Sequence, residues 1–512
     1  MSHSQSSPDS SPAVDTSQLF TEFQPLPRAD WEAKIKKDLK LGDDPAAADA
    51  AFRKKTTWRT AEGFNIRPFY DGEDLAELAL PENEAGRFAF SPNRASDSNA
   101  WEIREEVFDR SPADANARAK TALEAGVNSV SFVLHAEQGQ RHGVDLHADG
   151  NTSAAGLEQL LDGVWLDAAP VHFRCGAAAP AVLGLLKQEL DRQQIDAVKF
   201  SGTLDFDPCS ALAREGRLDA TAAFASAAAL VGFPQENLLG VRPLVVSDRV
   251  FHEAGAGIVE SLAIALAAGA ETLAGTVAAS DGKLDPAAVC QGLSFEATIS
   301  SNYFMEIARL RALRLLWARI AEAFGVTERA DRATYIHGRT SVWNLTIYDP
   351  HVNMLRATTE AMSAAIGACD ACTVLPFDLP LDPATANEFS ARISRNIQQV
   401  LKHEAYLDKV IDPAAGSYYL ENLSDQIARD AWAFFQEIEA AGGYFQSMQS
   451  GLIQKRVQAT GEAMRAAVAS RKRTVLGTNQ YPNGAEVMRE QLKAPAARPL
   501  PAAAALSDAD AI

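Results

Sequence analysis

Short apolar segments alternate with Ala- and Leu-rich stretches of helical periodicity from residue 101 to residue 376, and few folds accept this alternation. The eight strand candidates are residues 102–108, 129–134, 171–175, 197–201, 242–247, 294–299, 334–337 and 372–376. Helix candidates such as residues 114–125, 181–193 and 255–273 lie between them. Neighbouring parallel strands need crossover connections of this kind, and eight such units can close into a barrel. The pattern therefore predicts an α/β fold, a (β/α)8 TIM barrel.

The rest of the chain divides by composition. A helix is expected near residues 31–41, within an extended N-terminal arm. The predicted stretches are a polar, Ser-rich disordered tail (1–18), the N-terminal arm and lead-in (19–100), the barrel (101–405), a C-terminal helical extension (406–490) and a Pro- and Ala-rich tail (491–512).

Charge and cysteine content exclude several classes of function. The net charge of −19 argues against nucleic-acid binding, because phosphates repel an acidic surface. We find no apolar run near the roughly 20 residues that span a bilayer, and the polar start does not resemble a secretory signal. Five cysteines in a long chain do not suggest a disulfide framework, so we expect a cytoplasmic protein that acts on no membrane.

Four phrases in the second half of the chain carry a specific resemblance. They are N302-Y-F-M-E-I-A-R-L-R-A-L-R-L-L-W317, T340-S-V-W-N-L-T-I-Y348 followed by Asp349 and Pro350, E388-F-S-A-R-I-S-R-N396, and D412-P-A-A-G-S-Y-Y-L-E421. In order and spacing they resemble the acyl-CoA-binding barrel of methylmalonyl-CoA mutase, a cobalamin-dependent carbon-skeleton isomerase. The resemblance runs from about Trp58 to about Asn483.

The resemblance implies a role in a complex. Members of this family interconvert (R)-methylmalonyl-CoA and succinyl-CoA through an adenosylcobalamin-derived radical, and a cobalamin-binding domain follows the barrel. We expect no such flavodoxin-like domain here, and no cofactor bound by this chain. The expected role is that of the non-catalytic small (beta) subunit of a heterodimer. Its larger homologous partner would bind both the acyl-CoA and adenosylcobalamin.

Two positions support a non-catalytic role. The catalytic chains carry a histidine four residues before the Ala of a Glu-Ala-Gly motif; in S247-D-R-V-F-H-E-A-G255 this place falls on Val250. His252 lies two residues further on. The family's active-site tyrosine corresponds to Ser96 by ungapped counting. We therefore expect no catalytic residue and no metal ligand in this chain.

The barrel interior is expected to be filled by side chains. Val342 stands where the catalytic chains usually have Gly, and residues 371–378 form an apolar strand in place of a polar one. Bulky side chains at the axis are the ordinary state of such barrels. We therefore expect the axis to be closed to CoA.

Two further motifs have a plain interpretation. D145-L-H-A-D-G150 fits a cobalamin-domain pattern, but it lies directly after the second barrel strand, so we interpret it as a chance match. C369-D-A-C372 has no second pair of ligands at comparable spacing and precedes a strand, which favours buried cysteines over a zinc or redox site.

The helix that begins near Met305 should cover the outside of the barrel. Its arginines Arg309, Arg311 and Arg314 are candidates for the interface with the partner chain, with a solvated basic face as the alternative.

Three other functions fit parts of the sequence. The chain could be the catalytic barrel of a split mutase whose cobalamin domain is a separate polypeptide. It could be an acyl-CoA-binding protein that acts alone. It could also be a truncated form of a longer subunit.

Overall fold

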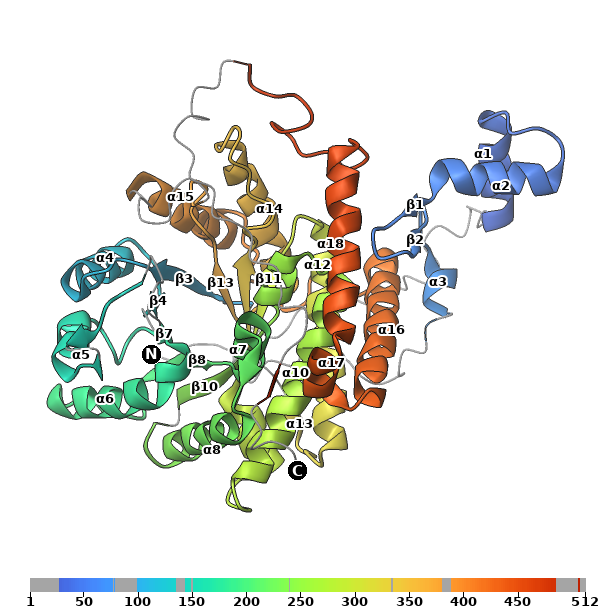
Figure 1. Ribbon diagram of the computed structural model, residues 1–512. Coiled ribbons are helices and arrows are strands. Elements are labelled where there is room, and N and C mark those ends of the chain that lie inside the picture. Colours follow the sequence, from blue (N-terminus) through green and yellow to red (C-terminus); the bar gives the residue numbers. More distant parts are fainter. Residues whose placement is uncertain are drawn as a thin grey trace, which may run out of the picture. The chain divides into compact units, whose positions relative to one another are not determined.

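The computed structural model describes residues 27–76, 78, 99–134, 143–148, 151–238, 240–332, 335–379, 388–484 and 505–506. The chain divides into two compact units, Met1–Phe69 and Tyr70–Ile512. The larger unit contains an eight-stranded parallel sheet surrounded by helices (Figure 1).

The described part of the smaller unit, residues 27–69, contains two helices and one strand pair. Helix α1 (Arg28–Asp38) starts three residues before the predicted helix. Helix α2 (Pro45–Thr56) buries Ala48 and Phe52, and the Asp44 carboxylate accepts a hydrogen bond from the Ala47 amide at its start. Strands β1 (Trp58–Arg59) and β2 (Asn65–Ile66) pair antiparallel.

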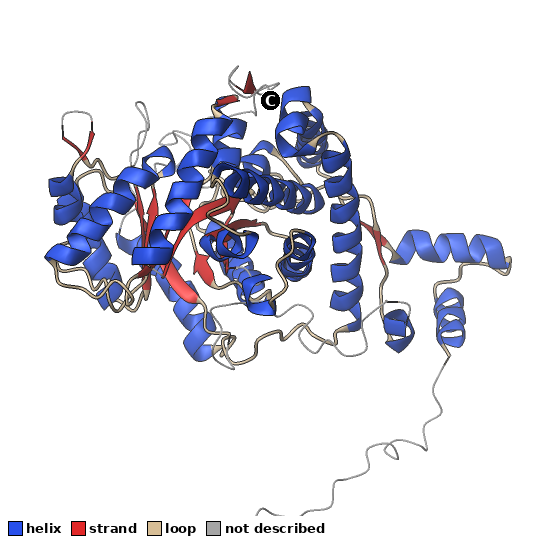
Figure 2. Cartoon of the chain, turned by 90° about the horizontal axis from the view of Figure 1, so that it is seen from below, coloured by secondary structure: helices blue, strands red, loops and turns tan. Residues whose placement is uncertain are grey.

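The barrel consists of the eight strands that the alternation predicts. In spatial order they are β7 (Val171–Arg174), β4 (Ser129–Val133), β3 (Glu102–Val107), β13 (Ala371–Thr373), β12 (Tyr335–Thr340), β11 (Leu293–Ile299), β10 (Gly240–Ser247) and β8 (Ser201–Phe206). Every pairing within this sheet is parallel. The two end strands also approach each other, since the Cys175 thiol on β7's C-terminal side donates to the Leu204 carbonyl of β8. Figure 2 shows the strands curving around a common interior. The (β/α)8 fold is confirmed.

One predicted strand is misplaced. Residues 197–199 form a turn, and β8 begins only at Ser201. The Asp196 side chain accepts a hydrogen bond from the Val198 amide, and its carbonyl accepts one from the Lys199 amide. Such Asp-initiated turns compete with strand formation.

Helices cover the outside of the sheet (Figures 1 and 2). The principal ones are α4 (Pro112–Glu124), α5 (Ala154–Leu161), α6 (Ala179–Arg192), α8 (Ala220–Asn237), α10 (Ile258–Ala279), α12 (Tyr303–Ala323), α14 (Val352–Ile366) and α15 (Glu388–Gln399). Side chains of Ser111, Ser153 and Asp219 cap three of them by accepting amide hydrogen bonds in the first turn. The C-terminal helices α16 (Tyr418–Ala440), α17 (Gly443–Ser450) and α18 (Leu452–Ala469) follow, as predicted.

Helix α10 corrects one expectation. Among the described residues it alone is long and apolar enough to cross a membrane, with a mean hydropathy of 1.6 over its best window. However, 67% of that window is buried, and the helix packs against α8, α12 and α16. Its apolar character is that of a helix enclosed on several sides by its own chain. The expectation that no apolar segment reaches this length was therefore wrong.

The seam between β7 and β8 depends on a glycine. A Cβ atom at Gly202 would lie 1.8 Å from the Val171 carbonyl oxygen. Gly202→Ala should therefore force the two strands apart and lower the free energy of unfolding by about 1–3 kcal/mol or more. Gly184 on α6 is the matched control, because no atom lies within 4 Å of the place that a Cβ atom would take there. Gly184→Ala should instead stabilise the protein by about 0.5–1 kcal/mol. Urea unfolding measures both changes, and equal effects would contradict this account of the seam.

Candidate functional site

A cavity of about 500 Å³ opens at the C-terminal ends of the barrel strands. Its lining comes from the strand ends and from helices α7 (Pro208–Glu215), α8 and α9 (Arg249–Ala254). The charged and polar residues in its lining include Glu106, Arg174, Asp205, Asp207, Ser247, Arg249, Glu296 and Arg339. Active sites of this fold form at the same end of the barrel, so this cavity is the candidate functional site.

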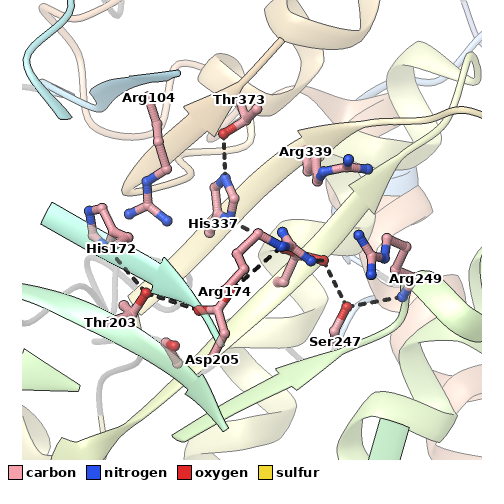
Figure 3. Close-up of polar contacts among 12 residues, drawn as sticks. Arg104, His172, Arg174, Thr203, Asp205, Ser247, Arg249, His337, Arg339 and Thr373 are labelled. Carbon is pink, nitrogen blue, oxygen red and sulfur yellow. Dashed lines mark hydrogen bonds and ion pairs between the residues drawn. The ribbon is translucent and has the colours of Figure 1, made fainter. Parts of the chain in front are cut away.

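Ion pairs cross the barrel at the floor of the cavity (Figure 3). Arg174 donates to Glu106 at 3.0 Å and also pairs with Glu296. Arg339 forms two hydrogen bonds to the Glu106 carboxylate, at 2.9 and 3.1 Å. The four side chains come from β7, β3, β11 and β12, so they link different sides of the barrel. We call these four residues the axial ion network.

The arginines of the axial ion network lower the pKa of its two glutamates. Burial would raise the pKa of Glu106, but the charges of Arg339 and Arg174 lower it to about 2. Burial opposes ionisation of Glu296 too, yet the charge of Arg174 and its contact with His337 hold its pKa well below the usual range. Both carboxylates therefore remain ionised at neutral pH.

A second polar group lies behind the network. The Arg104 guanidinium donates to the Tyr335 hydroxyl at 2.6 Å and to Glu102 at 3.1 Å. The His172 ring forms hydrogen bonds to Thr203 at 3.1 Å and to Ser129 at 3.0 Å. Figure 3 shows Arg104, His172 and Thr203 together in the barrel interior.

These contacts correct the prediction of an apolar interior. The axis is occupied by charged and polar side chains. The apolar residues Val374, Leu375 and Phe377 are buried, but they follow β13 instead of extending it. The Phe377 ring packs against His351 and Phe389, close to α14 and α15.

The sequence contained a signal for the polar interior. Glu102, Arg104 and Glu106 alternate with apolar or outward-facing residues along one strand, as do His337 and Arg339 along another. Charged residues at every second position of a buried parallel strand point to the same face, so this pattern indicates polar side chains inside the barrel.

Three buried histidines should stay neutral over the physiological range. Burial, reinforced by the charge of Arg104, lowers the pKa of His172 to about 3 and that of His337 to about 4, and burial lowers the pKa of His252 to about 4. The unfolded chain protonates these groups below about pH 6.5 while the folded chain does not, so they reduce stability as the pH falls through about 6.5 towards 4. In 15N-histidine NMR spectra we expect three rings with no titration between about pH 5 and 8. Titration of all nine histidines near pH 6.5 would contradict this.

Val250 and His252 lie in different surroundings. Val250, on α9, lines the cavity. His252 is not part of the lining; its Nε2 forms a 2.7 Å hydrogen bond with the Ser341 hydroxyl. Ser341 in turn accepts a hydrogen bond from the Trp343 amide, so its own proton is available to the neutral imidazole. His252 thus has a structural contact away from the cavity.

The other positions singled out by the resemblance are less informative. Val342 lies in the turn after β12, is partly exposed and does not line the cavity. Ser96 lies outside the described residues.

Helix α12 corrects the expected roles of its arginines. Arg309, Arg311 and Arg314 are only 3%, 2% and 1% exposed, so they form neither a solvated face nor an accessible contact surface. Arg309 pairs with Glu306 at 2.7 Å and with Asp248. Helix α12 lies between α10, α14 and α16, and internal carboxylates neutralise its charges.

The other two arginines have equally internal partners. Arg311 donates to Glu421 at 2.7 Å, to Asp412 at 3.1 Å and to Ser424 at 2.9 Å. Arg314 pairs with Asp370 at 2.8 Å. The fourth of the sequence phrases is thus partly explained, because its Asp412 and Glu421 bind an arginine of the first.

The remaining motifs have no metal-binding arrangement around them among the residues that the structure describes. Cys369 and Cys372 are buried, and the mutual contact and burial raise the pKa of Cys372 well above its usual range. His147 lies in the short strand β5 (His147–Ala148), which pairs with β6 (Asn151–Thr152) after β4. No cluster of three or more metal-ligating side chains occurs in the part of the chain that the structure describes.

Comparison with known proteins identifies the family. A family model described as methylmalonyl-CoA mutase matches residues 59–499. A methylmalonyl-CoA mutase small subunit of Porphyromonas gingivalis is 36% identical over 94% of this chain and 74% of its own length. The small subunit of Streptomyces virginiae gives the same values, and the large subunit of that organism is 30% identical over 83% of this chain and 59% of its own. The chain belongs to the methylmalonyl-CoA mutase family.

Proposed function

We propose that this chain is a non-catalytic small subunit of methylmalonyl-CoA mutase that pairs with a larger, homologous catalytic chain. The axial ion network carries the proposal. Glu106, Arg174, Glu296 and Arg339 occupy the barrel axis, and a pantetheine thread would have to displace at least one buried ion pair to enter. Breaking such a pair costs about 3–5 kcal/mol, which is a large share of the affinity of an ordinary ligand.

The cavity residues support the same role. The Val250 side chain has no atom that can donate or accept a hydrogen bond. The His252 ring forms its hydrogen bond with Ser341, outside the cavity. A catalytic barrel needs a hydrogen-bonding group over the reacting carbonyl. The relatives named small subunit, at 36% identity, are more similar than the one named large subunit, at 30%.

The described residues do not fit adenosylcobalamin. A cobalt-ligating histidine needs an enclosing sheet for the nucleotide tail. His147 instead lies in a pair of two-residue strands between barrel strand β4 and helix α5. We therefore assign adenosylcobalamin and the acyl-CoA to the larger chain, and we derive no chemical step for this one. Five free, buried cysteines support a cytoplasmic location.

The N-terminal unit offers a test of pairing. Trp31 and Trp58 are 36% and 51% exposed, which is a large apolar area for a small unit. Stable subunit pairs usually bury more than about 2,000 Å² in total. We expect deletion of residues 1–41 to weaken pairing with a large subunit at least tenfold in sedimentation experiments. The melting temperature of the isolated chain should change by no more than about 2 °C, because the barrel unit is a separate compact body.

Two outcomes would count against this use of the N-terminal unit. Full affinity after the deletion would show that the partner binds elsewhere. Parallel losses of affinity and of thermal stability would show that the segment supports the barrel.

A further inference from the structure

Arg339 has an unused hydrogen-bond donor. Its guanidinium holds Glu106 through Nε and Nη2, but Nη1 is buried with no hydrogen-bond partner among the described residues. The residue is 4% exposed and belongs to the cavity lining. Buried donors in native proteins are nearly always satisfied, so an unsatisfied one points to a water or ligand that completes the site.

Arg249 lies at the same end of the barrel with little to neutralise it. Its nearest carboxylate is Glu253 at 3.9 Å, too distant for a hydrogen bond. Its side chain is 27% exposed and lines the cavity. The positive charge of Arg174, then burial, and also the charge of Arg339, lower the pKa of Arg249. The Arg249 guanidinium is therefore repelled by two other positive charges, and a bound anion would reduce this repulsion.

The three arginines are close together. Figure 3 shows Arg249 and Arg339 on the right of the view and Arg174 at its centre, and the charges of Arg174 and Arg339 both act on Arg249. The carboxylates that pair with Arg174 are Glu106 and Glu296, which the axial ion network already uses, and Asp205, whose Oδ2 is 3.8 Å away. Asp207 and Glu215 also line the cavity, and the Asp207 carboxylate already accepts hydrogen bonds from the Ser210 and Ser247 amides. Burial raises the pKa of Asp205, and the charge of Arg174 opposes that shift.

We propose that Arg249 and Arg339, supported by Arg174, form a binding site for a small oxyanion at the floor of the cavity. The ligand class is a carboxylate or a phosphate, since planar guanidinium groups recognise both through paired N–H donors. The cavity volume of about 500 Å³ accepts a small acid with its hydration water. This site goes beyond the proposed subunit role and does not depend on it.

Isothermal titration of the full chain tests the site. Sodium phosphate and sodium succinate are titrated separately at constant ionic strength, so that the two sources of oxyanion are distinguished. We expect saturable one-to-one binding of at least one of them. Arg249→Gln should weaken this binding at least tenfold, whereas Glu253→Gln should tighten it, because it removes the competing carboxylate.

The control is an arginine outside the cavity. Arg319 on α12 pairs with Glu322 and its side chain is 57% exposed. Arg319→Gln makes the same change in net charge and should leave binding unchanged. Absence of saturable binding with both anions would overturn the proposal, since water alone would then satisfy Arg339. Equal effects of Arg249→Gln and Arg319→Gln would also overturn it, because anion binding would then depend on the net charge of the protein and not on a specific site. The tighter binding expected for Glu253→Gln cannot result from misfolding.

Discussion

Replacing Arg309 by methionine should lower the free energy of unfolding by about 3–5 kcal/mol. The substitution removes the partner of two buried carboxylates, Asp248 and Glu306, and also a 2.9 Å hydrogen bond to the Thr298 carbonyl. Both acids are almost fully buried, and an unpaired charge at such a place costs more than the pair itself contributes. Urea unfolding at neutral pH measures the loss.

The pH dependence of this loss identifies its cause. Burial already raises the pKa of Asp248, and the charge of Arg309 opposes that shift. Without the arginine the folded state holds protons that the unfolded state has released, so stability is regained as the pH falls. The deficit of Arg309→Met should therefore shrink from pH 7 towards pH 5.

Arg319 on the same helix is the control for this experiment. Its side chain is 57% exposed and its partner Glu322 is 50% exposed. Arg319→Met should cost no more than about 0.5 kcal/mol and show no pH dependence of the loss. Similar losses at both positions would mean that lost packing, and not an unpaired buried charge, explains the effect.

The strands of the barrel were predicted from the sequence better than the side chains that fill its interior. Strands β3 and β4 lie within one residue of their predicted ends. The start of β8 was missed because a local side-chain contact of Asp196 overrides the apolar run. Strand β13 ends at Thr373, three residues before the predicted end, so the apolar residues after it lie outside the sheet.

The ion pairs could not be predicted from local patterns. Glu106 and Arg339 are 233 positions apart, and Asp248 and Arg309 are 61 positions apart. A charge on a helix is ordinarily solvated, so Arg309, Arg311 and Arg314 suggested a surface. Glu306 is three positions from Arg309 on the same helix, but the other carboxylates are distant in the sequence, and only the folded chain brings them to these arginines: Asp248, Asp370, Asp412 and Glu421. Val250, in contrast, was located by counting within one short motif, and the structure places it in the cavity lining.

The second large effect concerns turnover. In the proposed role the isolated chain carries Val250 in place of the family's histidine and has no site for adenosylcobalamin. Loss of a positioned acid–base group typically costs about 10²–10⁴ in rate, and loss of the cofactor removes the radical chemistry entirely. We therefore expect no formation of succinyl-CoA above background by the purified chain.

The central claim is tested by assaying methylmalonyl-CoA isomerisation with added adenosylcobalamin in two samples. One contains this chain alone, and the other contains it together with a full-length large subunit. We predict no turnover by the chain alone and turnover by the pair, with one cobalamin bound per heterodimer. Isomerisation by the chain alone, or with only a separate cobalamin-binding protein, would contradict the account and identify a catalytic barrel.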